Sequence, residues 1–180
     1  NIRATRGAPD AVVLLSPQGR TFTQREAERL GRLGHVVLLC GRYEGIDERV
    51  RELVAAEEIS IGDYVLSGGE LPALVIVDAV SRLVPGVVGD EQSVEADSFV
   101  RGLLDYPHFT RPAEFGGLKV PDVLLSGHHA DVRRWRKREA LARTLARRPE
   151  LLEQASLDEE ERAMLKELTE SGKSKLQSQK

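Results

Sequence analysis

The amino-terminal half of the chain alternates short apolar runs with segments of helical character. Residues 11–15 and 35–40 contain almost no polar side chains, so each run predicts a strand that is buried on both faces. Helices are predicted after Thr23, where a glutamate follows at the capping-box spacing, and over residues 46–54 and 70–83. This alternation is typical of an α/β domain whose parallel sheet carries helices on both faces.

The composition changes in the second half of the chain. Residues 89–96 are polar and acidic without periodicity, and residues 105–122 are rich in proline and other turn formers. Residues 130–148 and 157–168 then follow with helical periodicity. We therefore predict an α/β domain over residues 1–88, a flexible linker over 89–97 and a small all-helical domain over 98–180.

Three glycine-containing turns follow the predicted strands, at residues 16–19, 41–45 and 67–69. Two short β-prone segments, 58–60 and 64–66, precede the third turn. In open α/β sheets ligands bind beyond the carboxyl ends of the strands, and glycine lets the backbone approach a ligand closely. None of the turns matches a dinucleotide fingerprint or a phosphate-binding P-loop. For each turn, a tight turn without any ligand is the alternative.

Charge is distributed unevenly along the chain, although the formal net charge is only −3. Residues 41–72 carry 3 basic and 8 acidic side chains, a balance that favours a cationic ligand over a phosphate. Residues 131–149 carry 8 basic and 2 acidic side chains. A helix so rich in arginine is typical of contact with a nucleic-acid backbone, and a solvated helix face is the alternative.

Three single residues are further candidates for chemistry, and each also has a simpler structural explanation. Arg82 ends an apolar helix, where the helix dipole alone favours a cation. Asp97 stands where the acidic linker meets the next helical stretch, a position that suits an N-cap. His108 lies in a proline-flanked loop with aromatic, basic and hydroxyl neighbours, which suits either a nucleotide or a packed linker.

Several classes of protein are excluded or disfavoured by the residues present. With one cysteine, Cys40, the chain forms no internal disulfide and no zinc cluster built on thiolates, and His128 and His129 lack partners at metal-ligand spacing. No apolar stretch approaches the roughly 20 residues of a membrane-spanning helix, and no signal peptide is visible. We therefore expect no membrane partner and a cytoplasmic location. Because the chain begins at Asn1 and not at methionine, we expect that an upstream segment is missing.

Long motifs in the chain closely resemble the bacterial tRNA (guanine-N(1)-)-methyltransferases, which belong to the SPOUT class of knotted methyltransferases. The resemblance runs from about residue 11 to about residue 170 in the same order and spacing. The motifs that carry it are LSPQG at 15–19, CGRYEGIDER at 40–49, SIGDYVLSGGELP at 60–72, LLDYPHFTRP at 103–112 and VLLSG at 123–127.

The resemblance implies a SPOUT-type α/β trefoil knot domain followed by the small helical domain, although ordinary chain rules argue against a knot. It implies an S-adenosylmethionine-dependent enzyme that methylates N(1) of the guanosine immediately 3′ of the anticodon in tRNA and so maintains the reading frame. It also implies a homodimer with a composite active site, and a magnesium requirement. The positions that match the family's cofactor contacts are Leu15, Pro17, Gly41, Tyr43, Ile61, Gly62, Asp63, Tyr64, Val65, Leu66, Gly68, Gly69 and Pro72.

The resemblance also gives roles to the remaining candidates. Guanine N(1) carries a proton at neutral pH, so its methylation needs a general base, and Asp97 matches the family's base. Arg82 matches the residue that stabilises negative charge growing on guanine O6. The acidic surroundings, including Glu44, suit a sulfonium cofactor and magnesium. We expect the guanine site and the tRNA backbone to be held by Asp105, His108, Arg133, Arg134 and Arg136.

The chain departs from the family pattern before Ala11, because an N-terminal strand and a glycine-rich loop that precede this region in the family are absent here. One alternative is therefore a truncated, inactive module that binds only cofactor or RNA. Another alternative is a related SPOUT enzyme that methylates a ribose 2′-hydroxyl, which would not need a base for N(1).

Overall fold

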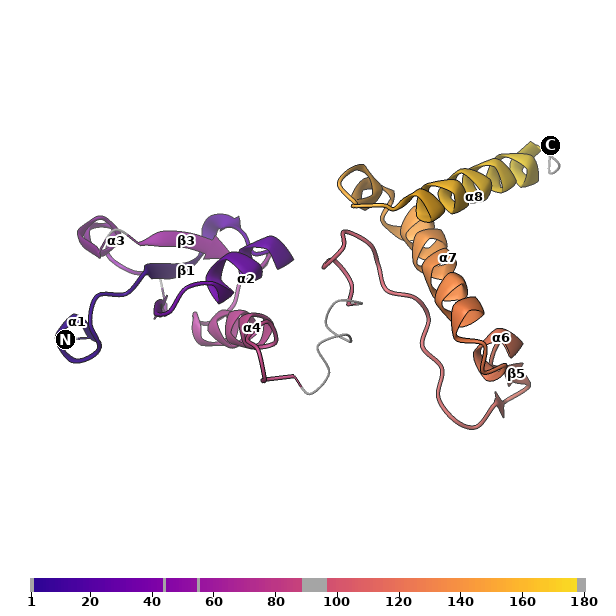
Figure 1. Cartoon of the computed structure of the whole chain (residues 1–180). Helices are drawn as coiled ribbons and strands as arrows, with labels where there is room; N and C mark the ends of the chain where they lie inside the picture. The colour runs from indigo at the N-terminus through magenta and orange to yellow at the C-terminus, as the bar shows by residue number, and fades with distance from the viewer. Residues whose placement is uncertain (1, 44, 55, 89–96, 178–180) are drawn as a thin grey trace. The chain divides into compact units, whose positions relative to one another are not determined.

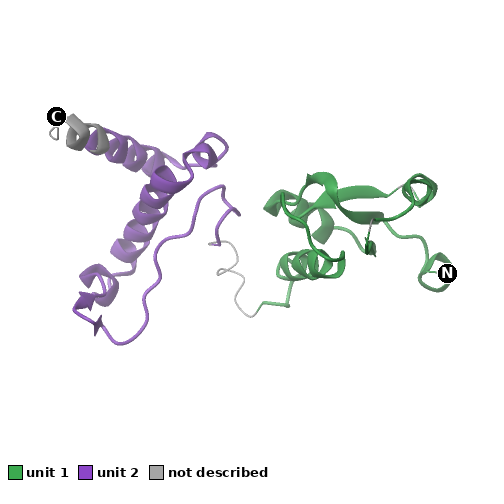
Figure 2. Cartoon of the chain, turned by 180° about the vertical axis from the view of Figure 1, so that it is seen from behind, with its two compact units in different colours: residues 1–94 green, residues 95–180 purple. Residues whose placement is uncertain are grey.

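The computed structural model describes residues 2–43, 45–54, 56–88 and 97–177, with the backbone alone for residues 172–177 (Figure 1). Two compact units divide the chain, unit 1 (residues 1–94) and unit 2 (residues 95–180), which Figure 2 shows in different colours. The predicted linker 89–97 lies outside the described residues except for Asp97.

Unit 1 contains a three-stranded parallel sheet. Its strands are β1 (Ala11–Thr21), β2 (Val36–Cys40) and β3 (Glu57–Ser60), in the order β2-β1-β3. The pairing begins at Ala11 opposite Val36 on one side of β1 and at Val13 opposite Glu57 on the other. The predicted mixed α/β fold with a parallel sheet is therefore confirmed.

The first glycine turn differs from the prediction, because it does not end its strand. The central strand β1 continues to Thr21 with a register shift, so that both Leu15 and Arg20 pair with Ile59. A Cβ atom at Gly19 would lie 2.4 Å from the backbone nitrogen of Ile59. Glycine is thus required where the interrupted strand passes the backbone of β3.

Helices α2 (Gln24–Gly31) and α4 (Glu70–Ser81) cover the sheet and contact each other. Val13 and Leu15 point toward them, and these residues form the buried core of unit 1 together with Leu30, Ile59 and Ile76. Side chains alternate along a strand, so Leu14 points to the opposite face. The sequence predicts helices on both faces, whereas both core helices contact the face that carries Val13.

Other elements of unit 1 differ in detail from the sequence prediction. Helix α1 (Ile2–Arg6) was not expected, and helix α3 (Glu48–Val54) begins later than the expected 46–54. Residues 64–66 were predicted to be β-prone, but they form no strand. Instead the Ser60 hydroxyl accepts a hydrogen bond from the Gly62 amide and donates one to the Gly62 carbonyl, which turns the chain after β3.

Unit 2 consists mainly of helices packed around Leu103, Leu141 and Met164. The helices are α6 (Asp122–Leu125), α7 (His129–Arg147), the 3₁₀ helix η1 (Pro149–Glu153) and α8 (Glu159–Gln177), and α7 packs on α8. An antiparallel pair, β4 (Glu114–Phe115) and β5 (Leu118–Lys119), departs from the expected all-helical domain. Within the described ranges, no helix combines the length and apolarity needed to cross a membrane.

Candidate functional site

A cavity of about 240 Å³ opens in unit 1 at the carboxyl ends of the parallel strands. All three predicted glycine turns contribute to its wall. Most of the residues predicted to bind cofactor line it: Leu15, Pro17, Gly41, Tyr43, Ile61, Gly62, Tyr64, Val65, Leu66, Gly68, Gly69 and Pro72. The structure therefore brings together positions that lie more than 50 residues apart in the sequence.

Two of the glycine turns are bonded directly to each other. The Gly69 amide donates a hydrogen bond of 2.8 Å to the Gly41 carbonyl, and Arg42 forms an isolated antiparallel bridge with Gly68. A Cβ atom at Gly69 would lie 2.8 Å from Cys40 Cα, closer than real Cβ contacts. The two turns can approach this closely only because residue 69 has no side chain.

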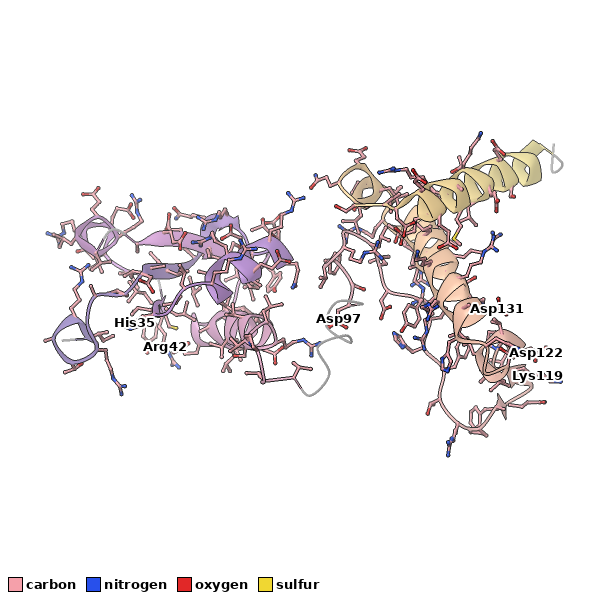
Figure 3. All side chains as sticks on the ribbon, viewed as in Figure 1. His35, Arg42, Asp97, Lys119, Asp122 and Asp131 are labelled. Atoms are coloured by element: carbon pink, nitrogen blue, oxygen red, sulfur yellow. The ribbon has the colours of Figure 1, made fainter. Side chains whose placement is uncertain are left out.

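A charged pair fixes the outer side of this contact. The Arg42 Nε donates to Glu70 Oε1 over 2.6 Å (Figure 3 labels Arg42), and the hydrogen bond lowers the pKa of Glu70. Burial and the nearby Glu70 carboxylate raise the pKa of the Cys40 thiol. Cys40 is therefore held in its neutral form beside the cavity.

The turn at 41–45 presents an aromatic ring to solvent. Tyr43 has a φ of 59°, a left-handed conformation that is rare for a bulky residue, and it is 97% exposed. Such strain clusters at functional sites, where surrounding structure holds it in place. Glu44, predicted as part of the acidic surroundings, lies outside the described residues.

The segment after β3 supplies the apolar side of the cavity. Tyr64, Val65 and Leu66 are all exposed large hydrophobic residues, and Val65 is 88% exposed. Asp63 is also exposed, but it is not among the residues that line the cavity. The apolar portion of a bound ligand would pack against these side chains and shield them from water.

Among the residues that the structure describes, the cavity lining contains the carboxylates of Glu48 and Glu58 and the guanidinium of Arg42. Arg42 is paired with Glu70 and Glu48 is paired with Arg51, so Glu58 is the lining carboxylate that favours a cationic group over an anion. Five further residues line the cavity without having been predicted as site residues from the sequence: Leu14, Ile46, Glu48, Glu58 and Ser60. Ile46 and Glu48 belong to the quoted CGRYEGIDER motif, so their place in that motif could have identified them.

The two predicted catalytic residues belong to different units. Arg82 is the exposed C-cap of α4 in unit 1, and its amide donates to the Asp78 carbonyl. Asp97 (Figure 3) is half-buried at the start of unit 2. There it lines a cavity of about 120 Å³ together with Asp105 and Glu161.

Asp105 and His108 form a contact within unit 2. The His108 Nε2 lies 2.5 Å from Asp105 Oδ2, and the Tyr106 ring lies 4.6 Å from the His108 ring, centroid to centroid. The Asp105 amide in turn donates to the Ser98 hydroxyl. Contacts within residues 98–108 therefore hold the carboxylate of Asp105 and the imidazole of His108 at hydrogen-bond distance.

The arginine-rich segment forms α7, and acidic residues pair with some of its cations but not with others. Lys137 and Arg138 form ion pairs with acidic residues at the start of α8 and along it. Arg133 and Arg136 have no ion pair within the described part of the chain, while Arg134 is 4.0 Å from Glu160. The Arg136 guanidinium lies 4.9 Å from the centre of the Tyr106 ring. The exposed arginines thus remain available to an anionic partner.

The parallel sheet and the glycine turns around an open cavity place the chain in the α/β class, whose members bind ligands in such a crevice. In comparisons with known families, the tRNA (guanine-1)-methyltransferase TrmD family matches residues 2–154. The chain belongs to this family, and the resemblance seen in its motifs is confirmed.

Relatives from several bacteria carry the name tRNA (guanine-N(1)-)-methyltransferase. The protein of Pelotomaculum thermopropionicum is 64% identical over 163 residues, which cover 91% of this chain and 65% of that protein. The protein of Halalkalibacterium halodurans is 60% identical over 86% of this chain and 63% of its own length. The protein of Thermus thermophilus is 62% identical over 88% of this chain and 66% of its own length. The chain thus spans just under two thirds of the length of these relatives.

Proposed function

We propose that this protein transfers a methyl group from S-adenosylmethionine to N(1) of the guanosine immediately 3′ of the anticodon in tRNA. This modification would maintain the reading frame. The observation that carries the proposal is the cavity of unit 1, because residues of all three glycine turns line it. The names of the relatives agree with a guanine-N(1) methyltransferase.

The residues of the cavity fit S-adenosylmethionine, which supplies the methyl group when bound. Tyr64, Val65 and Leu66 would cover an adenine ring, and the glycine turns would offer backbone hydrogen bonds to the polar groups. Glu58 would attract the positive charge of the ligand, whereas Glu48 is already paired with Arg51. The mixture of apolar rim, exposed backbone and carboxylates is what this amphipathic cation requires.

The proposed chemistry divides between Asp97 and Arg82. Asp97 would accept the proton of guanine N(1), because the ring nitrogen attacks a methyl group only as its proton leaves. Arg82 would stabilise the negative charge that then grows on guanine O6. Asp105 and His108, already in contact with each other, would line the guanine site.

The exposed arginines of α7 would hold the tRNA. Arg133, Arg134 and Arg136 present their charges to solvent, and phosphate groups release counterions when such side chains neutralise them. This contact is independent of base sequence, so it would position the substrate without selecting the guanosine. A tRNA substrate also agrees with the proposed cytoplasmic location.

Two further parts of the proposal concern architecture. The trefoil knot that the SPOUT class implies would be formed by the chain segments around the cavity of unit 1. A homodimer with a composite active site would explain why Leu71, Leu74 and Val75 form an exposed apolar stripe on α4. Isologous contact of such a stripe with its copy is the usual arrangement in homodimers.

The resemblance also implies magnesium. Among the residues that the structure describes, no group of three or more histidine, cysteine, aspartate or glutamate side chains could hold a metal ion. Magnesium is commonly held by only one or two carboxylates together with water and phosphate oxygens, so the magnesium requirement stays a prediction.

The decisive experiment is methyl transfer from labelled S-adenosylmethionine to unmodified tRNA with guanosine or adenosine beside the anticodon. We expect 1-methylguanosine in the digested guanosine tRNA and no product in the adenosine tRNA. A 2′-O-methylated nucleoside would identify a ribose methyltransferase instead. Binding of cofactor or RNA without any transfer would leave only a binding module.

The variant Asp97→Ala tests the assignment of the base. We expect the transfer rate to fall by about 10²–10⁴-fold, the usual contribution of general base catalysis, with cofactor binding retained. Asp122→Ala, which removes an exposed carboxylate of unit 2, is the control and should transfer normally. Unchanged transfer by Asp97→Ala would refute the role of Asp97.

A further inference from the structure

We propose that Thr144 and Glu161 are positioning residues for the methyl transfer, because they hold the segment 97–105 that carries Asp97 and Asp105. Neither side chain was singled out by its sequence, and both lie in the helices of unit 2. The inference rests on the proposed function, in which the two aspartates act on the guanine. It concerns how their positions are maintained.

Thr144 anchors the carboxyl end of the segment. Its side chain is fully buried in α7, and its hydroxyl oxygen accepts a hydrogen bond of 2.9 Å from the Leu104 amide. The same hydroxyl donates to the Ala140 carbonyl over 2.7 Å. The buried hydroxyl thus both donates and accepts a hydrogen bond, and the bond that it accepts comes from the residue next to Asp105.

Glu161 anchors the middle of the segment. The side chain is only 1% exposed, and its Oε2 accepts hydrogen bonds of 2.9 Å from both the Arg101 guanidinium and the Asp158 amide. The Asp158 carboxylate accepts a bond from the Glu161 amide in return, which forms a capping box at the start of α8. A capping box needs no arginine, so the bond to Arg101 is an additional link from α8 to the segment.

Packing brings the segment close to the helices between these two anchors. Leu103 is buried with Leu141 and Met164 in the core of unit 2. Gly102 has a φ of 76°, and a Cβ atom there would lie 3.0 Å from Ala155 Cα. The backbone of the segment therefore rests directly on the chain between η1 and α8.

The segment is also closed on itself, which links the anchors to the aspartates. The Phe99 amide donates to the Leu103 carbonyl over 2.7 Å, and the Asp105 amide donates to the Ser98 hydroxyl over 2.9 Å. Asp97 and Asp105 consequently line one cavity, to which Arg101 and Glu161 also contribute. Displacing Leu104 or Arg101 would change the separation of the two carboxylates, although neither anchor needs to touch the substrate.

The test compares Thr144→Val, which keeps the shape and removes both hydrogen bonds, with Thr144→Ser, which keeps the hydroxyl. We expect Thr144→Val to lower the single-turnover rate at saturating tRNA by about 10- to 100-fold, since small misplacements of reacting groups have effects of this size. The Kd values for tRNA and S-adenosylmethionine should stay within about twofold. Thr144→Ser should restore most of the rate.

Thr169→Val is the matched control, because the Thr169 hydroxyl makes the same bond to a helix carbonyl, that of Leu165, on the other helix. It should transfer at the normal rate. Glu161→Gln, which retains an acceptor for the Asp158 amide, should lower the rate about 3- to 10-fold if the bond to Arg101 positions the segment. A normal rate in Thr144→Val, or an equal loss in Thr169→Val, would overturn the proposal.

Hydrogen exchange of the Leu104 amide gives a readout that does not depend on transfer. Protection should be lost in Thr144→Val and retained in Thr144→Ser and Thr169→Val. If the unchanged protein transfers no methyl group, the proposed function fails while this measurement still decides whether Thr144 holds the segment. Full protection in Thr144→Val would refute the anchor itself.

Discussion

The wall of the cavity in unit 1 depends on the absence of single side chains. Gly69→Ala would place a methyl group 2.8 Å from Cys40 Cα and 3.1 Å from the Gly41 nitrogen, both of them backbone atoms. We expect this variant to lose about 1–3 kcal/mol of stability through overpacking and to bind S-adenosylmethionine more weakly. Gly31→Ala is the control, because its new methyl group would make only ordinary contacts. Calorimetric titration and thermal unfolding measure both effects, and normal cofactor binding by Gly69→Ala would contradict this role.

The sequence identifies such glycines as turn residues, but it does not show which atoms they approach. Gly69 follows the predicted pattern for a ligand-binding turn, yet its requirement arises from Cys40 and Gly41, almost 30 residues earlier. The same holds for Thr144 and Glu161, which look like ordinary helix residues until their partners are known. Contacts of this kind depend on tertiary packing, which the periodicity of a sequence does not encode.

At the scale of elements, a charged cluster joins the end of β1 to α2 and β3. Glu57 accepts hydrogen bonds from Arg20 and Arg29, and Glu26 accepts from the same two arginines. Burial alone would raise the pKa of Glu57, but the bonds from both arginines lower it, and the bond from Arg20 lowers the pKa of Glu26. The ionised carboxylates are therefore favoured in the folded state.

The lowered pKa values predict a pH-dependent contribution to stability. A carboxylate with a depressed folded-state pKa stabilises the protein fully above its unfolded value, about 4.3, and this contribution is lost as the pH falls through the folded-state value. Glu57→Gln should lower the free energy of unfolding by about 0.5–1 kcal/mol at pH 7, since the arginines are partly exposed. The difference should shrink in thermal unfolding as the pH is lowered from 7 to about 3, because the carboxylate is protonated as the pH falls through its folded-state pKa. Glu28→Gln, in α2, is the control, and an equal effect of Glu57→Gln at both pH values would contradict this account.

The boundaries of helices and strands were predicted well where the local sequence pattern determines them. They were predicted poorly where pairing with a neighbouring element determines them. The strand β2 and the helices α2, α4 and α7 follow their apolar periodicity. The turn chemistry at 16–19 suggested a strand end, but pairing with β3 continues β1 to Thr21. For residues 64–66 the β propensity had no partner strand to pair with, so the Ser60 and Gly62 turn prevailed.

At the scale of the whole molecule, the distribution of charge was informative even though the net charge was not. The acidic stretch 41–72 contributes Glu48 and Glu58 to the cavity of unit 1, and the basic stretch 131–149 forms most of α7 in unit 2. Each unit has its own buried core, so the two stretches belong to separately packed parts of the chain. The proposed roles of Arg82 and Asp97 likewise fall in different units.

That separation provides a test of the proposed composite active site. If one site takes Arg82 from one subunit and Asp97 from its partner, a heterodimer of Arg82→Ala and Asp97→Ala chains contains one intact site. Random exchange of subunits should then restore the rate of methyl transfer to about a quarter of the rate of the protein without substitutions. Half of the dimers are heterodimers, and each of these has one intact site out of two. If both residues act from the same subunit, no dimer in the mixture contains an intact site and the mixture stays inactive.

The apolar stripe on α4 supplies the control for this complementation. Leu74 is 62% exposed, and Leu74→Glu would place a charge where the proposed homodimer buries the stripe. Introduced into both inactive chains, Leu74→Glu should shift the sedimentation of each from dimer to monomer and abolish the recovered activity. Leu53→Glu, at an exposed leucine of α3 in the same unit, should leave both unchanged. Two results would show that the active site is not shared between subunits. One is recovered methyl-transfer activity in the monomeric variants, and the other is a protein without substitutions that sediments as a monomer at the assay concentration.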